Sequence, residues 1–582
     1  MGILLIPVLG FIPSLCYSQV GEGLSVRQSQ RTIEKLWSAH SLRLREERAP
    51  EMKARILEIG GVRMPFWFKV YGKEPKGGHT LWISLHGGGG TTKEINDGQW
   101  HNQQKLYTPK EGIYLAPRGP TDTWNLWHRS HMDPLLDRLI ENLIIFEGVN
   151  PNRVFLLGYS AGGDGVYQLA PRMADRWAAA AMMAGHPGDA RAEPLRNLPF
   201  TLHMGGKDSA YKRNEWAERW KERLTVLADE NPGDYRHWVE VHADKGHWMD
   251  REDAAAVPWM SQFERDLRPK RITWIQDDVL HSRFYWLAVD APQKGAVLDV
   301  ERQGQIFTVH AIEGVDSFRI RLDDSMVNLN RAIKVVEGEE ILFEGIVPRD
   351  EDCIQQTLNE RGDPSGVFTA EVAIRVRSEV FNEKFDSPES FDGFDFSDAQ
   401  VLNWSEEGGG SLGWSEGSSY RPPFRSPLTV ALLKDVEVRD FVLDAEVMQS
   451  GKEYAHRDIC FFFQFESASK YRYIHLATQP DRNAHNVFSV AAADRRPLLD
   501  VQAKGVRWGR KEWHHVRIDS SSHRGTVQVF FDDMKRPVME TVLEGEGWGR
   551  VGFGSFDDPG RIRVFRLRAS ASRLAESGNP FD

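Results

Sequence analysis

The sequence predicts an α/β protein with a doubly wound sheet, followed by a small β-sandwich and a C-terminal β jelly-roll. Strand-like runs such as LWISL (81–85) and RVFLLGY (153–159) alternate with helix-like runs up to about residue 267. Short strands separated by turns dominate residues 271–376, and a second set rich in aromatic residues fills residues 418–570. The length of 582 residues allows several cores of ordinary domain size.

The first 18 residues have the character of a secretory signal peptide. Apolar residues run from Ile3 to Ile12, and small residues follow at Cys16 and Ser18. The run lacks basic residues before it and is short for a membrane span. We therefore expect residues 1–18 to be removed, no membrane span, and a chain that is secreted or held in the periplasm or cell envelope.

The α/β domain is expected over residues 25–268. A charge-rich helical segment within 25–56 leads into a hairpin formed by RILEI (55–59) and MPFWFKVYG (64–72), after which strands and helices alternate.

Two further domains follow. Helix signals fade in residues 269–377, which predicts a small β-rich domain. The Ser-, Glu-, Asp- and Gly-rich residues 378–417 are expected to be a linker leading into a jelly-roll at 418–570.

Composition limits the partners. Asp and Glu number 84 against 73 Lys and Arg, a formal net charge of −11, which disfavours nucleic-acid binding. Removal of the signal leaves Cys353 and Cys460, too few for a disulfide framework, and no Cys/His cluster has zinc-site spacing. We expect no nucleic-acid partner, no metal and no cofactor.

The stretch GYSAGGDG (158–165) contains Gly158-x-Ser160-x-Gly162, the spacing that exposes a nucleophilic serine on a turn between strand and helix. At average residue usage the pattern arises by chance roughly 0.2 times in a chain of this length, and it does recur around Ser415. Ser160 ends a strand-like run and begins a helix-competent segment, whereas neither strand nor helix is expected around Ser415. Context therefore favours Ser160 as the nucleophile.

An oxyanion hole needs two backbone N–H groups. Ala161 follows the serine and supplies one of them. The other is expected from LHGGGG (85–90), which follows a predicted strand, so that Gly87 and Gly88 are the candidates.

A serine nucleophile also needs a base and an orienting acid, in the chain order Ser, Asp or Glu, His. Asp208 follows the strand-like FTLHM (200–204), and His247 follows the next strand-like run, HWVEVH (237–242). Both are therefore expected at the sheet edge that carries Ser160.

Other acids and histidines compete for these roles. Asp189 remains the alternative acid, and Asp244 is interpreted as a surface or loop-capping residue. His203 and His242 lie within predicted strands, which favours packed histidines.

The loop TDTWNLWHRSHMD (121–133) places Trp124, Trp127 and His128 near the same edge. These residues either form a substrate-binding platform for a sugar or an aromatic acid, or pack beneath the loop. The sequence leaves both interpretations open.

Four motifs, LHGGGG, GYSAGG, GGKD (205–208) and GHW (246–248), resemble those of the α/β-hydrolase superfamily over residues 55–267. The resemblance is to secreted esterases of the polyhydroxybutyrate depolymerase and feruloyl esterase type, and to dienelactone hydrolase-like and prolyl oligopeptidase-like relatives. It implies Ser160 as nucleophile, Asp208 as acid and His247 as base, the same roles that the residue spacing predicts.

The C-terminal region resembles the concanavalin A-like or laminin G-like jelly-rolls of secreted carbohydrate-active proteins, through residues 512–534 and 549–558. The resemblance implies a glycan-binding module. No E-x-D-x-E run suggests a second, glycosidic active site. Five aspartates in this region are candidates for calcium binding or, the favoured interpretation, turn capping: Asp458, Asp532, Asp533, Asp557 and Asp558.

The leading hypothesis is a secreted serine hydrolase that cleaves carboxylic esters, with polysaccharide-linked esters as the expected substrates. The alternatives are a serine peptidase of the prolyl oligopeptidase type and a carbohydrate-binding surface protein with an inactive hydrolase domain.

Overall fold

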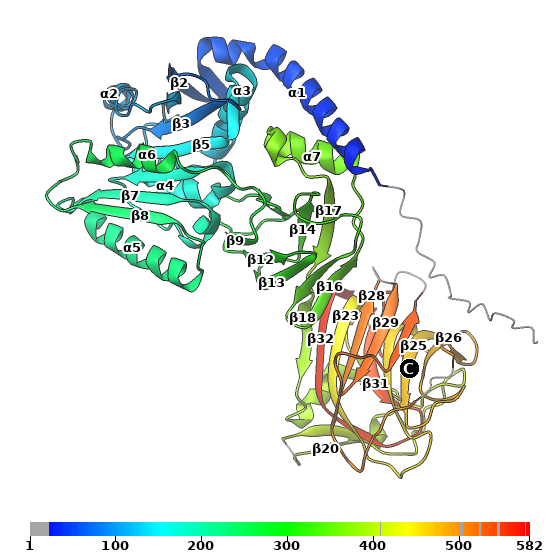
Figure 1. Cartoon of the computed structure of the whole chain (residues 1–582). Coiled ribbons are helices and arrows are strands. Elements are labelled where there is room, and N and C mark those ends of the chain that lie inside the picture. Colours follow the sequence, from blue (N-terminus) through cyan, green and yellow to red (C-terminus); the bar gives the residue numbers. More distant parts are fainter. Residues whose placement is uncertain are drawn as a thin grey trace, which may run out of the picture. The chain divides into compact units, whose positions relative to one another are not determined.

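The computed structural model describes residues 23–407, 409–500, 504–522, 525–543, 547–576 and 578–581, so the expected signal peptide lies outside the described residues. The chain divides into two compact units, Met1–Ile374 and Arg375–Asp582 (Figure 1). None of the helices in the described ranges is long and apolar enough to cross a membrane.

The first unit is built on an eight-stranded sheet with the order β1-β2-β4-β3-β5-β6-β7-β8. Strand β2 pairs antiparallel with β1 and β4, and the other pairs are parallel. This sheet confirms the predicted α/β fold. Its strands are β1 Ile56–Ile59, β2 Val62–Tyr71, β3 His79–Leu85, β4 Gly112–Pro117, β5 Val149–Tyr159, β6 Ala179–Met183, β7 Phe200–Gly205 and β8 His237–His242.

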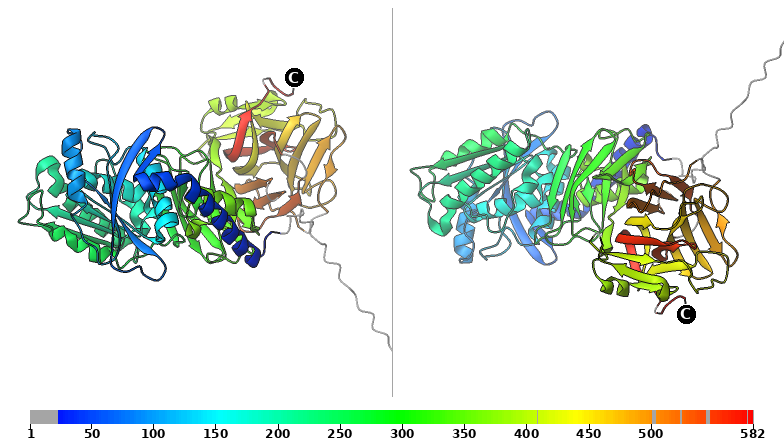
Figure 2. Two further views of the ribbon diagram at one scale, coloured as in Figure 1. Left: turned by 90° about the horizontal axis from the view of Figure 1, so that it is seen from above. Right: turned by 90° about the horizontal axis from the view of Figure 1, so that it is seen from below.

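Helices cover both faces of this sheet. Side chains alternate between the two faces along β5. Phe155 and Leu157 share an apolar cluster with Met260 of α6 on one face, and Gly158 lies against Gly162 of α4 on the other. In Figure 1, α6 and α5 lie on opposite sides of β7 and β8. The long α1 (dark blue in Figure 2) runs beside α3 and α7. The bounds are α1 Val26–Ala54, α2 Lys93–Gln103, α3 Met132–Glu147, α4 Ala161–Arg172, α5 Arg213–Glu230 and α6 Ala256–Met260.

Two smaller sheets complete the first unit, as the predicted β-rich region requires. One has the order β16-β15-β13-β12-β9 and the other β10-β11-β14-β17. Their strands are β9 Arg271–Ile275, β10 Arg283–Phe284, β11 Leu287–Ala288, β12 Val297–Gln303, β13 Ile306–Glu313, β14 Ser317–Leu322, β15 Ile333–Glu337, β16 Glu340–Gly345 and β17 Ala370–Arg375.

The expectation that helix signals fade in this region was wrong at α7, Glu351–Arg361. The Asp350 side chain caps its first turn by accepting from the Cys353 N–H, and Gly362 ends it with a φ of 59°. Both are standard helix-capping residues, so the signal was present in the sequence.

Buried ion pairs join the β-rich part to the α/β sheet. Arg361 on α7 pairs with Asp175, which follows α4, and Arg265 pairs with Asp363. Each of these four side chains is at most 6% exposed. The expected boundary between residues 268 and 269 is therefore not a boundary between compact units.

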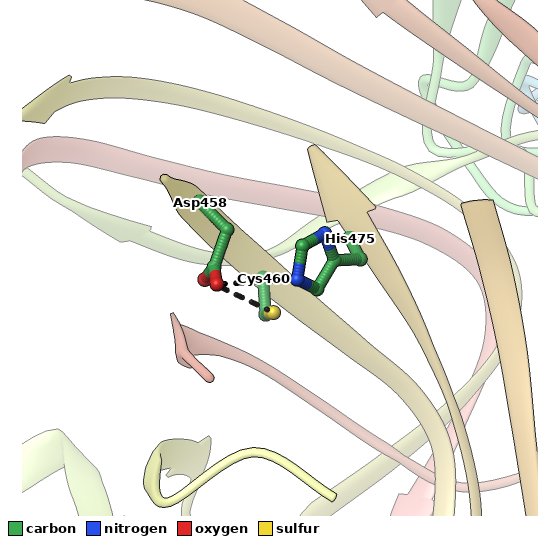
Figure 3. A group of neighbouring side chains, drawn as sticks. All are labelled: Asp458, Cys460 and His475. Atoms are coloured by element: carbon green, nitrogen blue, oxygen red, sulfur yellow. Dashed lines mark hydrogen bonds and ion pairs between the residues drawn. The ribbon is translucent and has the colours of Figure 1, made fainter. Parts of the chain in front are cut away.

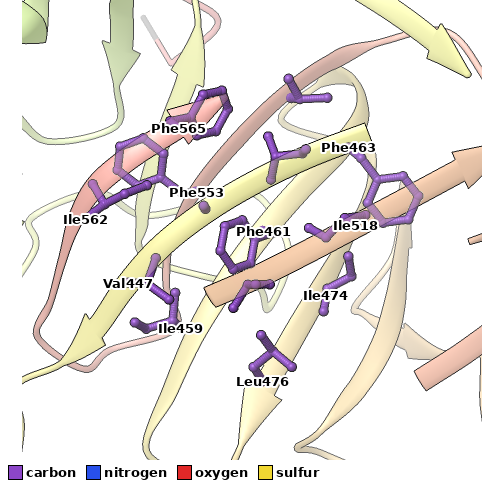
Figure 4. Packing of buried hydrophobic residues seen from close by; sticks show 14 of the residues in the cluster. Val447, Ile459, Phe461, Phe463, Ile474, Leu476, Ile518, Phe553, Ile562 and Phe565 are labelled. Carbon is purple, nitrogen blue, oxygen red and sulfur yellow. The ribbon is translucent and has the colours of Figure 1, made fainter. Parts of the chain in front are cut away.

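The second unit is a sandwich of two antiparallel sheets, which confirms the predicted β-rich character of this region. One sheet has the order β20-β21-β32-β23-β28-β29-β30, with β18 also paired to β32, and the other has the order β19-β22-β31-β24-β25-β26-β27. Their facing side chains, among them Val447, Phe461 and Phe565, form one buried core (Figure 4). The main strands are β22 Thr429–Leu433, β23 Val436–Gln449, β24 Asp458–Ser467, β25 Lys470–Ala477, β26 Asn486–Ala491, β27 Arg496–Pro497, β28 His514–Ser521, β29 Thr526–Phe531, β30 Met539–Val542, β31 Arg550–Ser555 and β32 Gly560–Leu574.

The segment 378–417 is part of this sandwich, and its prediction as a linker was wrong. It contains β18 Ser378–Glu383, β19 Phe394–Phe396, β20 Leu402–Ser405 and β21 Ser411–Trp414. Phe385, Phe394, Leu412 and Trp414 are each at most 2% exposed and belong to the common core. The polar residues between them dominate the composition, but these few large apolar side chains determine where the segment packs.

Candidate active site

Ser160 occupies a strained turn between β5 and α4. Its φ of 57° and ψ of −121° are rarely adopted by residues other than glycine. A Cβ at Gly158 would lie 2.2 Å from the carbonyl oxygen of Gly162, and a Cβ at Gly162 would lie 2.1 Å from that of Leu85. The two glycines therefore permit the close backbone contacts that hold Ser160 in this turn.

The structure brings Ser160, His247 and Asp208 together from three loops. His247 Nε2 lies 2.9 Å from Ser160 Oγ, and His247 Nδ1 lies 2.6 Å from Asp208 Oδ2. The carboxylate can only accept at neutral pH, so Nδ1 carries a proton and Nε2 is free to accept one from the serine. The Asp208 side chain is 2% exposed and that of His247 is 43% exposed, so the imidazole faces solvent and the carboxylate does not.

The backbone around His247 is held by an aromatic residue next to the serine. The Tyr159 hydroxyl donates to the His247 carbonyl at 2.7 Å and accepts from the Met249 N–H at 3.1 Å. On the acid side, Arg213 Nη1 lies 3.5 Å from Asp208 Oδ1. Neither Tyr159 nor Arg213 was predicted from the sequence.

The competing residues have other partners. Asp189 accepts from Gln168 at 3.3 Å, and the Asp244 side chain is 95% exposed. His203 is fully buried, and burial lowers its pKa to about 3, while His242 bonds to Glu252. These positions fit packing and surface roles.

The predicted oxyanion loop is held in place by His86. Nδ1 of His86 donates to the Gly87 carbonyl at 2.6 Å, and Nε2 accepts from the Gly119 N–H at 3.0 Å. Burial lowers the pKa of His86 to about 4, so the ring stays neutral with its proton on Nδ1. In a trans peptide the carbonyl and the next N–H point in opposite directions, so this bond also aims the Gly88 N–H.

Gly87 and Ala161 adjoin Ser160, whereas Gly88 lies beside the Asn96 side chain. A Cβ at Gly87 would lie 3.2 Å from Ser160 Cβ, and Gly88 has a φ of 102°. The first helical hydrogen bond of α4 runs from Asp164 N to Ser160 O. The Ala161 N–H therefore precedes the helical bonds and is available to a ligand.

The sequence left open whether the aromatic residues of loop 121–133 form a substrate platform or pack beneath the loop, and the structure separates them. Trp127 is fully buried, its Nε1 donates to the His86 carbonyl at 2.8 Å, and its expected place on a substrate platform was wrong. Trp124 is 68% exposed, and a Cβ at Gly89 of the glycine loop would lie 3.1 Å from its carbonyl oxygen. His128 is half-buried with its ring 5.2 Å from that of Trp124.

Two exposed aromatic residues near the triad were missed. Tyr211, three residues after Asp208, is 77% exposed, and Trp248, directly after His247, is 50% exposed. Tyr211 has a φ of 55°, and the Arg213 guanidinium stacks on its ring at 5.0 Å. Their positions beside the two predicted triad residues were visible in the sequence.

Asp164 is a further buried carboxylic acid close to Ser160. It lies one helical turn after Ser160, and its Oδ1 accepts from the His186 N–H at 2.6 Å. Burial raises its pKa to about 6.

The second motif, around Ser415, does not form a comparable turn. Ser415 directly follows β21, contrary to the expectation that no strand precedes it. Its N–H and hydroxyl both bond to the Val401 carbonyl, at 2.9 and 3.2 Å.

A buried cluster of Asp458, Cys460 and His475 in the second unit has the residue types of a metal site (Figure 3). His475 Nδ1 accepts from the His485 N–H at 3.3 Å, so Nε2 carries the proton and donates to Asp458 at 3.1 Å. Metal-bound histidines show the reverse pattern, with a bare nitrogen toward the metal and an N–H donated behind it. Burial raises the pKa of the Cys460 thiol, which donates to Asp458. The cluster is therefore a hydrogen-bonded group around Asp458.

Four of the five C-terminal aspartates accept backbone N–H groups, but of these four bonds only that from Lys535 to Asp533 lies within one turn. The donors to Asp458, Asp532, Asp533 and Asp558 are the N–H groups of Phe556, His515, Lys535 and Asp458, respectively. Asp557 accepts no such bond among the described residues.

No family model and no curated protein matches the chain. Among solved structures, it is similar to a thermostable esterase at 20% identity over 36% of this chain and 62% of that one, with a TM-score of 0.30. It is also similar to a ferulic acid esterase at 13% identity over 36% of this chain and 96% of that one, with a TM-score of 0.27. A carbohydrate-binding module from Bacillus subtilis is similar at 11% identity over 31% of this chain and 94% of that one, with a TM-score of 0.22. The chain thus spans 62% of the length of the thermostable esterase.

Proposed function

We propose that this protein is a serine hydrolase of the α/β-hydrolase superfamily that cleaves carboxylic esters through Ser160, His247 and Asp208. The observation that carries the proposal is the continuous hydrogen-bonded path from Asp208 through His247 to a serine held at a φ of 57°. A partly exposed serine bonded to an imidazole, itself bonded to a buried carboxylate, is the arrangement that activates a hydroxyl as a nucleophile.

In the first half of the reaction, Ser160 Oγ attacks the ester carbonyl carbon and its proton moves to His247 Nε2. Asp208 stabilises the resulting imidazolium through Nδ1. The N–H groups of Gly88 and Ala161, with Gly87 against the serine, stabilise the negative oxygen of the tetrahedral intermediate. The C–O bond then breaks, and the departing alcohol takes the proton from Nε2, which leaves an acyl group on Ser160.

In the second half, a water molecule attacks the acyl carbonyl and gives its proton to the same Nε2 atom. The tetrahedral intermediate forms again and collapses with release of the carboxylic acid. Proton return from Nε2 to Ser160 Oγ restores the enzyme. The partial exposure of His247 gives water access to this position.

The expected substrates are carboxylic esters linked to polysaccharides. In the described part of the first unit, the exposed tryptophan and tyrosine side chains are those of Trp124, Tyr211 and Trp248. Tyr211 and Trp248 lie close in sequence to Asp208 and His247, and Trp124 lies beside the glycine loop, where a Cβ at Gly90 would be 3.6 Å from its Cβ. Flat aromatic faces suit the rings of a sugar or an aromatic acid. A secreted or cell-envelope location, through the signal expected at 1–18, and a glycan-binding role for the second unit fit this substrate class.

The test is labelling of the mature chain with a fluorophosphonate probe, together with turnover of p-nitrophenyl esters, feruloyl esters and matched anilides. The Ser160→Ala variant is expected to lose both labelling and ester turnover. The Ser415→Ala variant is the matched control, because it removes the serine of the second motif, and it is expected to retain both.

Two outcomes would contradict the proposal. Faster turnover of anilides and peptides than of esters would identify a peptidase. A folded parent that neither reacts with the probe nor turns over any ester would favour a carbohydrate-binding protein with an inactive hydrolase domain.

A further inference from the structure

Asp164 carries an acceptor near the triad that the proposed reaction does not use. It lies one turn after Ser160 on α4, where its N–H donates to the Ser160 carbonyl at 3.0 Å. One carboxylate oxygen, Oδ1, accepts from the His186 N–H at 2.6 Å. The other, Oδ2, has no partner among the residues that the structure describes, and the residue is only partly buried. Oδ2 is therefore open to a ligand.

The loop after β6 is built to meet this carboxylate. A Cβ at Gly163 would lie 3.0 Å from the Gly185 Cα, and a Cβ at Gly185 would lie 2.4 Å from the Gly163 carbonyl carbon. Ala184 has a φ of 51°, which is strained for a residue with a side chain. The two glycines and the strained alanine together bring the His186 N–H onto Asp164.

The same loop leads from Asp164 to α5. His186 Nδ1 accepts from the Gly188 N–H at 3.0 Å, and burial, followed by Arg213, lowers the pKa of His186. The neutral ring therefore carries its proton on Nε2. This ring meets that of Trp216 edge-on, with 5.7 Å between the centroids. Trp216 and Arg213 lie three residues apart, and so on one face of α5.

Arg213 completes this chain of contacts at the triad. Its Nη1 lies 3.5 Å from Asp208 Oδ1, and Asp208 is joined through His247 to Ser160. Burial raises the pKa of Asp164 to about 6, whereas its backbone hydrogen bond, Arg213 and His247 act in the opposite direction. Asp164 therefore belongs to the surroundings of the reacting groups.

Holding the loop does not by itself require a carboxylate at this position. An asparagine would accept from the His186 N–H without the cost of burying a charge. What the carboxylate adds is a strong acceptor at Oδ2. A substrate carboxylate would be repelled by Asp164, and a substrate ammonium by Arg213 and by the imidazolium that forms on His247. A hydroxyl group is neutral and donates, so it suits this acceptor.

We propose that Asp164 is a specificity-determining residue that accepts a hydrogen bond from a substrate hydroxyl close to the ester that Ser160 attacks. The proposal rests on the serine hydrolase function proposed above. The hydroxyl belongs either to the acyl group or to the alcohol, and matched substrates distinguish these two sources.

The experiment compares esters in which a hydroxyl is replaced by a methoxy group, because a methoxy oxygen cannot donate. Ethyl 2-hydroxypropanoate and ethyl 2-methoxypropanoate test the acyl group, and 2-hydroxyethyl butyrate and 2-methoxyethyl butyrate test the alcohol. Acid release at constant pH gives kcat/KM for each ester. The test variant is Asp164→Asn, which keeps an acceptor for the His186 N–H. The matched control is Asp189→Asn, which makes the same change at an exposed aspartate of the same loop.

We expect the parent to prefer the hydroxyl member of one pair by at least about tenfold in kcat/KM, the effect of one hydrogen bond to a charged group. In Asp164→Asn this preference should fall to within about threefold, with little change for the methoxy ester. The control should keep the preference of the parent. The proposal is overturned if the parent shows no preference in either pair, if the preference survives in Asp164→Asn, or if this variant loses turnover of both members equally.

The pH dependence of the preference is a second test, which needs no variant. Both members of a pair need the same neutral His247, so its titration cancels in the ratio of their kcat/KM values. The other groups facing Asp164 are Arg213, which stays charged, His186, whose pKa is lowered, and Tyr167, whose pKa is raised. A protonated Asp164 can donate to a methoxy oxygen, so the preference should decline as the pH falls through about 6. A constant preference across this range would contradict the proposal.

Fluorophosphonate labelling of the parent separates this proposal from the one on which it rests. Labelling of Ser160 without any hydroxyl preference refutes only the role of Asp164. A folded parent that is neither labelled nor active on any ester refutes both.

Discussion

Replacement of His86 by alanine tests how the glycine loop is built. The His86 side chain bonds the buried Gly87 carbonyl and the buried Gly119 N–H, so His86→Ala leaves both backbone groups without these partners. Each unpaired buried group costs about 1–3 kcal/mol, so the free energy of unfolding should fall by about 2–6 kcal/mol.

The same change should impair catalysis more than substrate binding. Without the bond to Gly87, the peptide that carries the Gly88 N–H is free to rotate, and loss of one oxyanion donor costs roughly 10²–10³ in kcat. KM for a small ester should change little, because the proposed role of the loop is to stabilise the oxyanion that develops in the transition state.

The assay is steady-state hydrolysis of p-nitrophenyl acetate, with urea unfolding measured on the same samples. The control is His101→Ala, which removes an exposed histidine on the neighbouring α2. The reasoning is refuted if His86→Ala, folded under assay conditions, retains kcat within about threefold of the parent.

Three further predictions concern the acid, the aromatic loop and the buried ion pairs. Asp208→Asn should keep the fold but lower kcat by about 10³–10⁴, because the imidazole loses its orienting carboxylate, and single-turnover kinetics measure this loss. Trp127→Ala should lower the free energy of unfolding by about 3–5 kcal/mol, whereas Trp124→Ala should change it by less than about 0.5 kcal/mol, as thermal or urea unfolding can show. Arg361→Met should cost about 3–5 kcal/mol because it leaves Asp175 buried without its main partner. Burial raises the pKa of Asp175, but Arg361 and Arg283 outweigh burial and hold it below its usual range. This contribution to stability is therefore complete above about pH 4 and is lost as the pH falls further, which a pH series of unfolding curves measures against Arg361→Met.

The placement of the triad followed from a topological rule. Ser160, Asp208 and His247 each come after a predicted strand, and the carboxyl ends of parallel strands lie at one edge of a sheet. The structure places His247 within hydrogen-bonding distance of both Ser160 and Asp208. Motif position and strand order were sufficient because each residue is fixed by local chain geometry.

The position of Trp127 could not be predicted in this way. A Cβ at Gly165 would lie 2.4 Å from Trp127 Cβ, so the tryptophan packs where α4 lacks a side chain. That contact joins residues 38 positions apart, and no local pattern indicates it. By contrast, Trp124 in the same loop remains exposed.

The segment 378–417 was misjudged for a related reason. Its composition is that of a linker, yet Phe394 and Trp414 are buried between the two sheets of the sandwich. A few large apolar residues on short strands supply most of the burial, and their partners lie more than 100 residues away on β31 and β32. The polar average composition of residues 378–417 therefore did not indicate these strands, because they pair with strands far away in the sequence.

The most direct test of the central claim is to trap the acyl-enzyme. The parent chain is mixed with p-nitrophenyl acetate, quenched in acid after one turnover time, digested and examined by mass spectrometry. We expect one acetyl group on the peptide that contains Ser160, with one p-nitrophenol released per chain in the burst. Acetylation of another residue, or steady turnover with no acylated Ser160 at any quench time, would contradict the account.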